Sequence, residues 1–256
     1  MPRILILGLV FGLVAGLLVG GFHNLFTVPV IERAIDFEEA RSAELNPNAA
    51  DEEPLISLGA QRWGMAAGTG IYGAILGVVF AAGVTVLRKV VPDWKPLAIT
   101  LTAAALGFWA LSLFPFIRYP LSPPGVGEGD TLTYRQGLQT MFMILSVLGV
   151  GVLLYGIREI NERFRETAAR FKVYGFAAGA YVVFALVMFF AHPANPDPVP
   201  VPIDMLELFR ALSMIGQFLT WLLMALGATA GMYWYQRRDE KAGNHFDPVT
   251  GTPVGL

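Results

Sequence analysis

The chain has 256 residues, of which 55% are hydrophobic and 15% are charged, and its formal net charge is −2. This composition excludes an ordinary soluble domain, which is less apolar and more charged, and the slightly acidic balance argues against nucleic acid as a partner. The absence of cysteine excludes disulfides, thiolate metal sites and cysteine nucleophiles.

The apolar residues fall into six long uncharged runs, each close to or above the roughly 20 residues that a helix needs to cross a bilayer. Because backbone polar groups find no water there, we expect α-helices. The predicted spans are 4–26, 62–88, 97–117, 136–157, 172–191 and 209–235. The sequence thus predicts an all-α integral membrane protein with a single six-span domain, residues 1–240, and a disordered polar tail, residues 241–256.

The first span carries glycine at every fourth position, at Gly8, Gly12, Gly16 and Gly20. These residues share one helical face, and glycine faces allow close backbone approach between helices in lipid. The spacing leaves two alternatives open, an interface to another protein chain or a buried packing helix. A signal peptide is disfavoured, because no small-residue cleavage site follows, and we expect this span to be retained.

Residues 27–58 form an acidic loop after the first span. Thr27-Val28-Pro29 is typical of a helix start, and the apolar and acidic residues that follow predict an amphipathic helix on the outer membrane surface. His23, Glu32, Asp36 and Glu39 are candidate metal ligands, because imidazole and carboxylates bind divalent cations. The alternative interpretation is a solvated acidic face without a ligand.

Charge placement predicts the orientation of the six spans. The loops on the side opposite the termini hold six of the 18 basic residues and the other side holds twelve, so we expect both termini in the cytoplasm. The outer loops hold 13 of the 20 acidic residues. An acidic outer face concentrates cations, although it also follows simply from basic residues being kept inside.

The third span ends in PFIRYPLSPPGVG, residues 115–127, which we call the proline segment. Pro115 is expected to end or kink the span, Arg118 and Tyr119 to lie at the outer interface, and the following residues to fix an extended course and a tight turn. That set is Pro120, Pro123, Pro124, Gly125 and Gly127. The segment would line a cation entrance with its carbonyls or serve as an ordered connector.

Arg62, Arg118 and Arg210 stand at the outer ends of three different spans. They either snorkel to the interface or pair with Glu32, Asp36 or Glu207 and hold the outer loops across the helix ends. Among the neutral polar residues inside the spans, Gln217 is the most notable, because its amide has four hydrogen-bonding sites that need partners in lipid.

The sequence offers little support for catalysis. It holds no P-loop, no G-x-S-x-G, no H-E-x-x-H and no redox pair, so we expect no enzyme and no tightly bound cofactor. No span carries an ionisable residue near its centre, which disfavours proton coupling within this chain. The methionines Met65, Met141, Met143, Met188, Met214, Met224 and Met232 are soft donors, with packing as the favoured interpretation.

Three blocks of the sequence resemble the predicted cobalt transporter family CbtA. They are FHNLFTVPVIERAIDFEEA, PFIRYPLSPPGVGEGDTLTYRQ, and DMLELFRALSMIGQFLTW with Arg210 and Gln217. The resemblance implies a bacterial inner-membrane protein that takes up cobalt for cobalamin synthesis, with Co²⁺ as the transported ion and a small single-span, histidine-bearing protein as its partner. A homo-oligomer and a non-transporting scaffold that binds its partner through the Gly8–Gly20 face are the alternatives.

One stretch departs from the family pattern. Many members carry a histidine-rich stretch in the first outer loop, whereas this loop reads RSAELNPNAADEEPLIS, without histidine. Carboxylates alone do not favour Co²⁺ over the more abundant Mg²⁺ or Ca²⁺. The sequence therefore leaves open whether the missing loop histidines abolish selectivity for cobalt.

Overall fold

The computed structural model describes residues 2–45, 58–123, 129–164, 167–197, 199 and 201–241, and this part of the chain is helical with no strand. Six of its helices are long and apolar enough to cross a membrane, which confirms the predicted class. The elements are α1 (Pro2–Phe22), η1 (His23–Thr27), α2 (Val28–Leu45), α3 (Leu58–Val90), α4 (Pro96–Phe108), η2 (Trp109–Leu113), α5 (Phe114–Arg118), α6 (Leu132–Arg163), α7 (Thr167–Ala191) and α8 (Ile203–Lys241).

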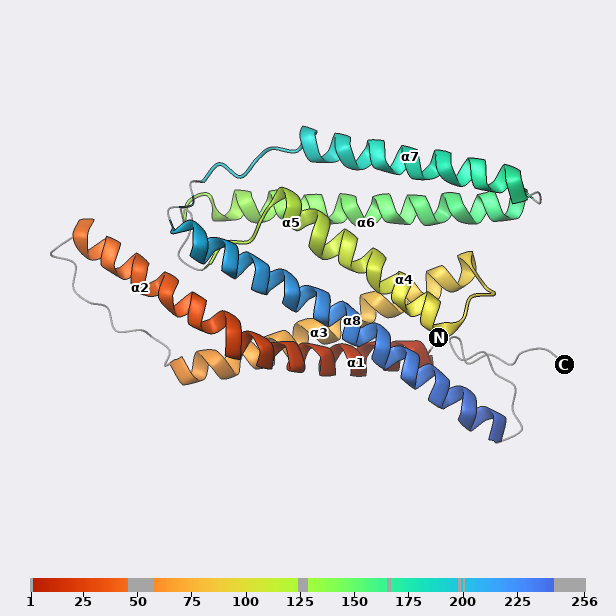
Figure 1. Ribbon diagram of the computed structural model, residues 1–256, viewed down its shortest axis with the longest axis horizontal. Helices are drawn as coiled ribbons and strands as arrows, with labels where there is room; N and C mark the ends of the chain where they lie inside the picture. The colour runs from red at the N-terminus through yellow and green to blue at the C-terminus, as the bar shows by residue number, and fades with distance from the viewer. Residues whose placement is uncertain are drawn as a thin grey trace.

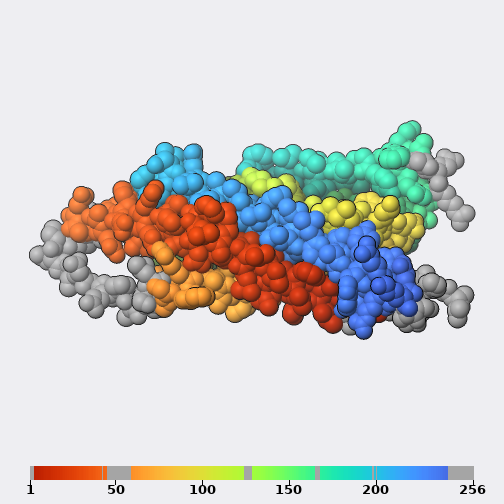
Figure 2. Space-filling view, turned by 60° about the horizontal axis from the view of Figure 1, so that its bottom comes forward, coloured from red at the N-terminus to blue at the C-terminus, as the bar shows by residue number. Residues whose placement is uncertain are grey.

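The helices form a packed group of α1, α3, α4 and α8, with the α6–α7 hairpin alongside it (Figure 1). The space-filling view shows α8 lying across α1, with α7 along the opposite edge (Figure 2). Arg3 pairs with the buried carboxylate of Asp239, so α1 begins where α8 ends. We call this the terminal end of the bundle, and we call the opposite end, which holds the proline segment, the proline end.

The glycine face of α1 lies directly against α3. A Cβ added to Gly12 would stand 2.3 Å from the Gly73 carbonyl oxygen, and one added to Gly8 would stand 2.2 Å from that of Gly77. A Cβ added to Gly16 would likewise clash with the Thr69 carbonyl oxygen, and one added to Gly20 with the Thr69 hydroxyl oxygen. The face is therefore occupied within the chain, and a scaffold that bound its partner through Gly8–Gly20 would first have to separate α1 from α3.

The main core joins all four helices of the packed group. Its largest fully buried side chains include Phe80 from α3 and Trp221, Met224 and Met232 from α8. Thr100 and Thr229 hydrogen-bond across the α4–α8 contact with 2.6 Å between their hydroxyl oxygens. In lipid such bonds add to close packing in holding helices together. A second cluster around Phe142 ties α5 and α6 to the end of α7.

Two π-helices interrupt otherwise continuous helices, and a proline follows each of them. The Val28 N–H bonds to the His23 carbonyl, and the Phe114 N–H bonds to the Trp109 carbonyl, both five residues back. Pro29 and Pro115 lack an N–H and would clash with the carbonyls of Leu25 and Leu111, four residues back. Both of these residues stand at the centre of a π-helix, whose wider turn relieves the clash.

The π-helix at η1 corrects one prediction. The helix α2 begins at Val28, within the start expected at 27–29, but it is not separate from the first span, because the chain runs as one helix from Arg3 to Arg41. Pro115 does not end the third span, since the helix continues to Arg118. The remaining predicted spans each fall within a helix. Residues 46–57, Pro124, Gly125, Gly127 and the tail beyond residue 241 lie outside the described residues.

Candidate functional site

Both π-helices face the same stretch of α8. The His23 ring of η1 lies against Gly216, where an added Cβ would stand 2.4 Å from the imidazole Nε2. Ser112 of η2 donates a hydrogen bond to the amide oxygen of Gln217, 3.1 Å away. Because π-turns are frequent at functional sites of helices, the junction at Gly216 and Gln217 is a candidate site.

Beside this junction lie two adjoining cavities of about 250 and 210 Å³, which we call the vestibule. They share Tyr119, Leu121 and Gln139 as wall residues. The inner chamber reaches into the bundle between α3, η2, α6 and α8, and the outer chamber opens toward the proline end. The vestibule therefore begins under the proline segment and ends beside the two π-helices.

The inner chamber is mostly apolar, with walls that include Leu76, Leu111 and Phe116, but it also carries neutral donor groups. Its polar walls are Tyr72, Ser112, Gln139 and Gln217, together with the thioethers of Met143 and Met214. Trp221 Nε1 donates to the Ser112 hydroxyl at 3.2 Å, and Ser112 in turn donates to Gln217. Since Ser112 fixes the amide oxygen of Gln217, that group is held in place on the chamber wall.

Arg135, a wall residue of the outer chamber, belongs to an ion pair that sequence reasoning missed. Arg135 of α6 pairs with Asp197 at 3.0 Å, and Thr131 donates to the same carboxylate oxygen at 2.7 Å. The Asp197 side chain is 4% exposed. This buried pair ties the segment after α7 to the start of α6. Its sequence signal was weak, because Asp197 stands in a proline-rich loop where a charge is ordinarily solvated.

Arg118 and Tyr119 join the proline segment to the end of α7. The Arg118 guanidinium donates to the His192 carbonyl, and the Tyr119 hydroxyl donates to the Pro193 carbonyl at 2.6 Å. The guanidinium also lies 5.3 Å from the ring centre of Phe189. We call these contacts the clasp. Of the two alternatives left open for Arg118, snorkelling or pairing with a carboxylate of an outer loop, the structure shows neither in that form: Arg118 joins outer segments through the His192 carbonyl.

His192 is buried beside this clasp, and its Nε2 has no hydrogen-bond partner in the described part of the chain. Burial lowers the pKa of His192 from its ordinary value, and the neighbouring Arg118 cation lowers it further. Burial raises the pKa of Tyr119, its neighbour. Both groups are therefore neutral at pH 7, and a proton on His192 would place a second buried cation next to Arg118.

The clasp should therefore weaken in acid. Folding lowers the pKa of His192. The contribution of neutral His192 to stability is therefore complete above the pKa of the unfolded state, about 6.5, and is lost as the pH falls through the pKa of the folded state. We expect thermal unfolding of the purified protein to occur at lower temperature at pH 5 than at pH 7.5. His192→Phe should remove part of that pH dependence, and an identical pH profile in the variant would contradict this account.

The four predicted metal ligands do not come together. His23 Nδ1 bonds to the Thr27 hydroxyl at 2.8 Å, and Glu32 pairs with Arg62 at 2.7 Å. Asp36 and Glu39 are exposed on α2. No group of three or more His, Asp or Glu residues that could hold a metal ion occurs within the described ranges. The acidic face of α2 is thus solvated in this conformation.

The other predicted residues lie at the proline segment, in the vestibule and in the Arg62–Glu32 ion pair. Arg210 Nε donates to the Leu121 carbonyl at 2.9 Å, which ties the start of α8 to the proline segment. Pro120 lines the outer chamber, and Pro123 is fully buried. The Arg62–Glu32 pair is half-exposed, and such pairs contribute little to stability. Of the predicted set, Tyr119, Pro120 and Gln217 contribute directly to the vestibule.

Comparison with known proteins places the chain in a family. A family model described as probable cobalt transporter subunit (CbtA) matches residues 1–234, which confirms the resemblance drawn from the three sequence blocks. No curated protein and no solved structure gives a significant match. The matched range includes every wall residue of the vestibule.

Proposed function

The chain belongs to the CbtA family of probable cobalt transporter subunits, and from that premise we propose that it is the permease component through which cobalt enters the cell. The observation that carries this proposal is the vestibule, a mostly apolar chamber inside the bundle whose walls also carry neutral oxygens and two thioethers. A channel or carrier site must bind its ion firmly enough to admit it and weakly enough to release it. Neutral donors would hold a cation weakly enough to release it.

The donor types also suit the proposed ion. Amide and hydroxyl oxygens at Gln139, Gln217 and Ser112 can replace part of the hydration shell of a divalent cation. The thioethers of Met143 and Met214 are soft donors, which transition metals accept and which Mg²⁺ and Ca²⁺ do not favour. Selectivity for Co²⁺ would thus reside in the bundle and need no histidines in the first outer loop.

The proposed orientation of the vestibule rests on the distribution of charge. With twelve basic residues on the side of the termini, the positive-inside rule directs that end to the cytoplasm and the vestibule to the outside. Asp130, Asp204 and Glu207 stand in or beside the loops of the proline end and would concentrate cations there. The resemblance to the family further implies, and we propose, that the protein is a multi-pass component of the bacterial inner membrane and that the imported cobalt serves cobalamin synthesis.

The vestibule does not by itself cross the bundle. Beyond Leu111 lies a further cavity of about 260 Å³ whose walls are apolar apart from the Trp221 indole. A cation would be held back there by the cost of losing its hydration. We propose that the small single-span, histidine-bearing partner, or a second copy of this chain, opens this stretch by moving the α6–α7 hairpin.

The direct test is cobalt accumulation in a host that lacks its own cobalt uptake. Cells would express this chain alone, the chain with the small single-span partner, or neither, and would be supplied with Co²⁺, Ni²⁺ or Mg²⁺. We expect uptake selective for Co²⁺ when both proteins are present. Correct membrane insertion without any metal uptake would reject the permease role and leave a non-transporting scaffold as the better description.

A further inference from the structure

A large cavity lies at the terminal end, away from the vestibule. Its volume is about 760 Å³, within the range of roughly 300–1,000 Å³ typical of small-molecule sites. It lies between the end of α3, the α3–α4 connector, α4, α6 and the first half of α7. We call it the terminal-end cavity. The apolar cavity beyond Leu111 separates it from the vestibule.

The walls of the terminal-end cavity change character with depth. Its inner walls are aliphatic and come mainly from Leu106, Leu153 and Leu154. Its rim carries two opposite charges, Asp93 on the α3–α4 connector and Arg170 on α7. Trp94 and Tyr174, rings of the kind that favour the headgroup depth of a bilayer, stand on the same rim.

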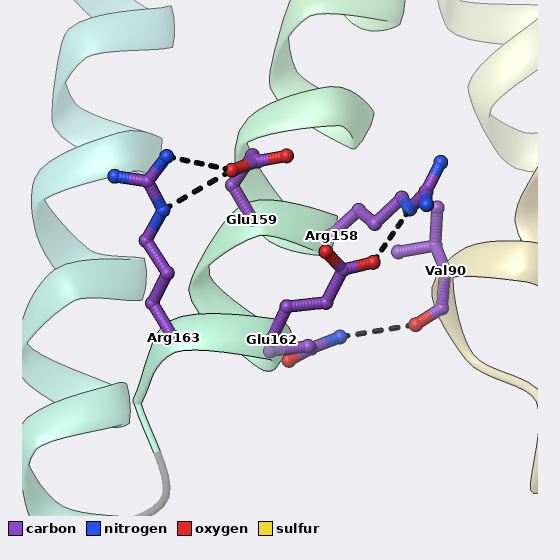
Figure 3. Close-up of polar contacts among 6 residues, drawn as sticks. Val90, Arg158, Glu159, Glu162 and Arg163 are labelled. Atoms are coloured by element: carbon purple, nitrogen blue, oxygen red, sulfur yellow. Dashed lines mark hydrogen bonds and ion pairs between the residues drawn. The ribbon is translucent and has the colours of Figure 1, made fainter.

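Polar contacts fix this rim. Arg170 Nε and Nη2 both donate to the Phe164 carbonyl, at 3.0 and 2.8 Å, and a guanidinium has five N–H donors, more than these two bonds use. The Tyr174 hydroxyl donates to Asn161, which donates to the Val90 carbonyl at 3.0 Å. Figure 3 shows the bond to Val90 next to the ion pairs at the end of α6.

Water and cations are poor occupants of such a cavity. Filling it would take about 25 waters of roughly 30 Å³ each, placed largely against aliphatic walls that offer them no hydrogen bonds. A cation would meet the Arg170 guanidinium at the entrance. An empty space would leave α3, α4, α6 and α7 without dispersion contacts along their facing sides.

We propose that the terminal-end cavity binds one zwitterionic phospholipid of the phosphatidylethanolamine class. The phosphate bonds to Arg170, whose planar fork suits phosphate oxygens, and the ammonium lies toward Asp93. One acyl chain fills the space between α4 and the α6–α7 hairpin. The lipid thereby fills the gap between the hairpin and the rest of the bundle, and this role is independent of which ion the protein transports.

The test is lipid binding to the delipidated protein, measured by native mass spectrometry with dioleoylphosphatidylethanolamine as the probe. We expect one lipid per chain and about tenfold weaker binding in Arg170→Ala. Arg163→Ala is the matched control, because Arg163 lies at the same end but is exposed and, within the described ranges, pairs with Glu159. Equal affinity in the wild-type protein and Arg170→Ala would overturn the proposal.

Two further measurements test the acyl-chain wall and the headgroup contacts independently. Ala178→Trp places a bulky ring against the apolar wall without changing a charge and should reduce lipid binding about tenfold. Unchanged binding would show that no acyl chain occupies this cavity. Dioleoylphosphatidylglycerol should bind at least threefold more weakly, because its headgroup has no ammonium for Asp93. Inorganic phosphate at millimolar concentration should not displace the lipid, and displacement would identify a simple anion site and overturn the proposal.

Discussion

Gly12→Leu should prevent stable folding of the bundle. Even a Cβ at this position would stand 2.3 Å from the Gly73 carbonyl oxygen and 2.9 Å from the Gly77 Cα. These are backbone atoms, which cannot rotate away as a side chain can. Overpacking ordinarily costs about 1–3 kcal/mol, and we expect at least the upper end of that range here. Size-exclusion profiles and thermal unfolding in mild detergent would measure the loss.

Gly21→Ala provides the control for this change. Gly21 lies on the same helix, and nothing stands within 4 Å of an added Cβ. Alanine favours the helix by roughly 0.5–1 kcal/mol over glycine, so the control should be as stable as the wild-type protein or slightly more stable. A folded, monodisperse Gly12→Leu protein would show that the α1–α3 contact is not needed for the fold.

The second large effect concerns the thioethers of the vestibule. The double change Met143→Leu and Met214→Leu keeps side-chain volume, and each such exchange usually costs less than about 1.5 kcal/mol of stability. It removes both soft donors from the inner chamber. We expect the initial rate of Co²⁺ uptake to fall about tenfold, equivalent to about 1.4 kcal/mol, with a smaller change for any Mg²⁺ leak.

Met141→Leu is the matched control for the thioether variant. Met141 lies two residues from Met143 on α6 but is 51% exposed on the outside of the bundle. Cobalt uptake should be unchanged in this control, and the amount of each protein in the membrane should be measured alongside. If the double variant takes up cobalt at the wild-type rate, the thioethers do not contribute to selectivity.

The sequence predicted the spans well because their signal is local. Each uncharged run is long enough to cross a bilayer, and each lies within one helix of the structure. The regular spacing from Gly8 to Gly20 also predicted a close helix contact, but spacing cannot name the partner helix. Its partner, α3, carries Gly73 and Gly77 at the same four-residue interval, and only the fold brings the two faces together.

The vestibule was harder to predict from the sequence, because its walls come from four helices. Gln217 was recognised by the cost of its amide in lipid, but its partner Ser112 is 105 residues away. The two π-helices had a usable signal, since Pro29 and Pro115 each follow an otherwise helical run. Pro29 was instead expected to start a helix and Pro115 to end or kink one, although in a membrane bundle a wider turn can accommodate proline.

The central claim is that cobalt passes through the vestibule, and the absence of cysteine from the chain makes a direct test possible. Met143→Cys would place a single thiol in the inner chamber, and cobalt uptake would be measured in the same cells before and after a small, membrane-impermeant methanethiosulfonate reagent is added. We predict uptake before modification and little uptake after it. Met141→Cys should be insensitive to the reagent. Undiminished uptake by a fully modified Met143→Cys protein would contradict the claim.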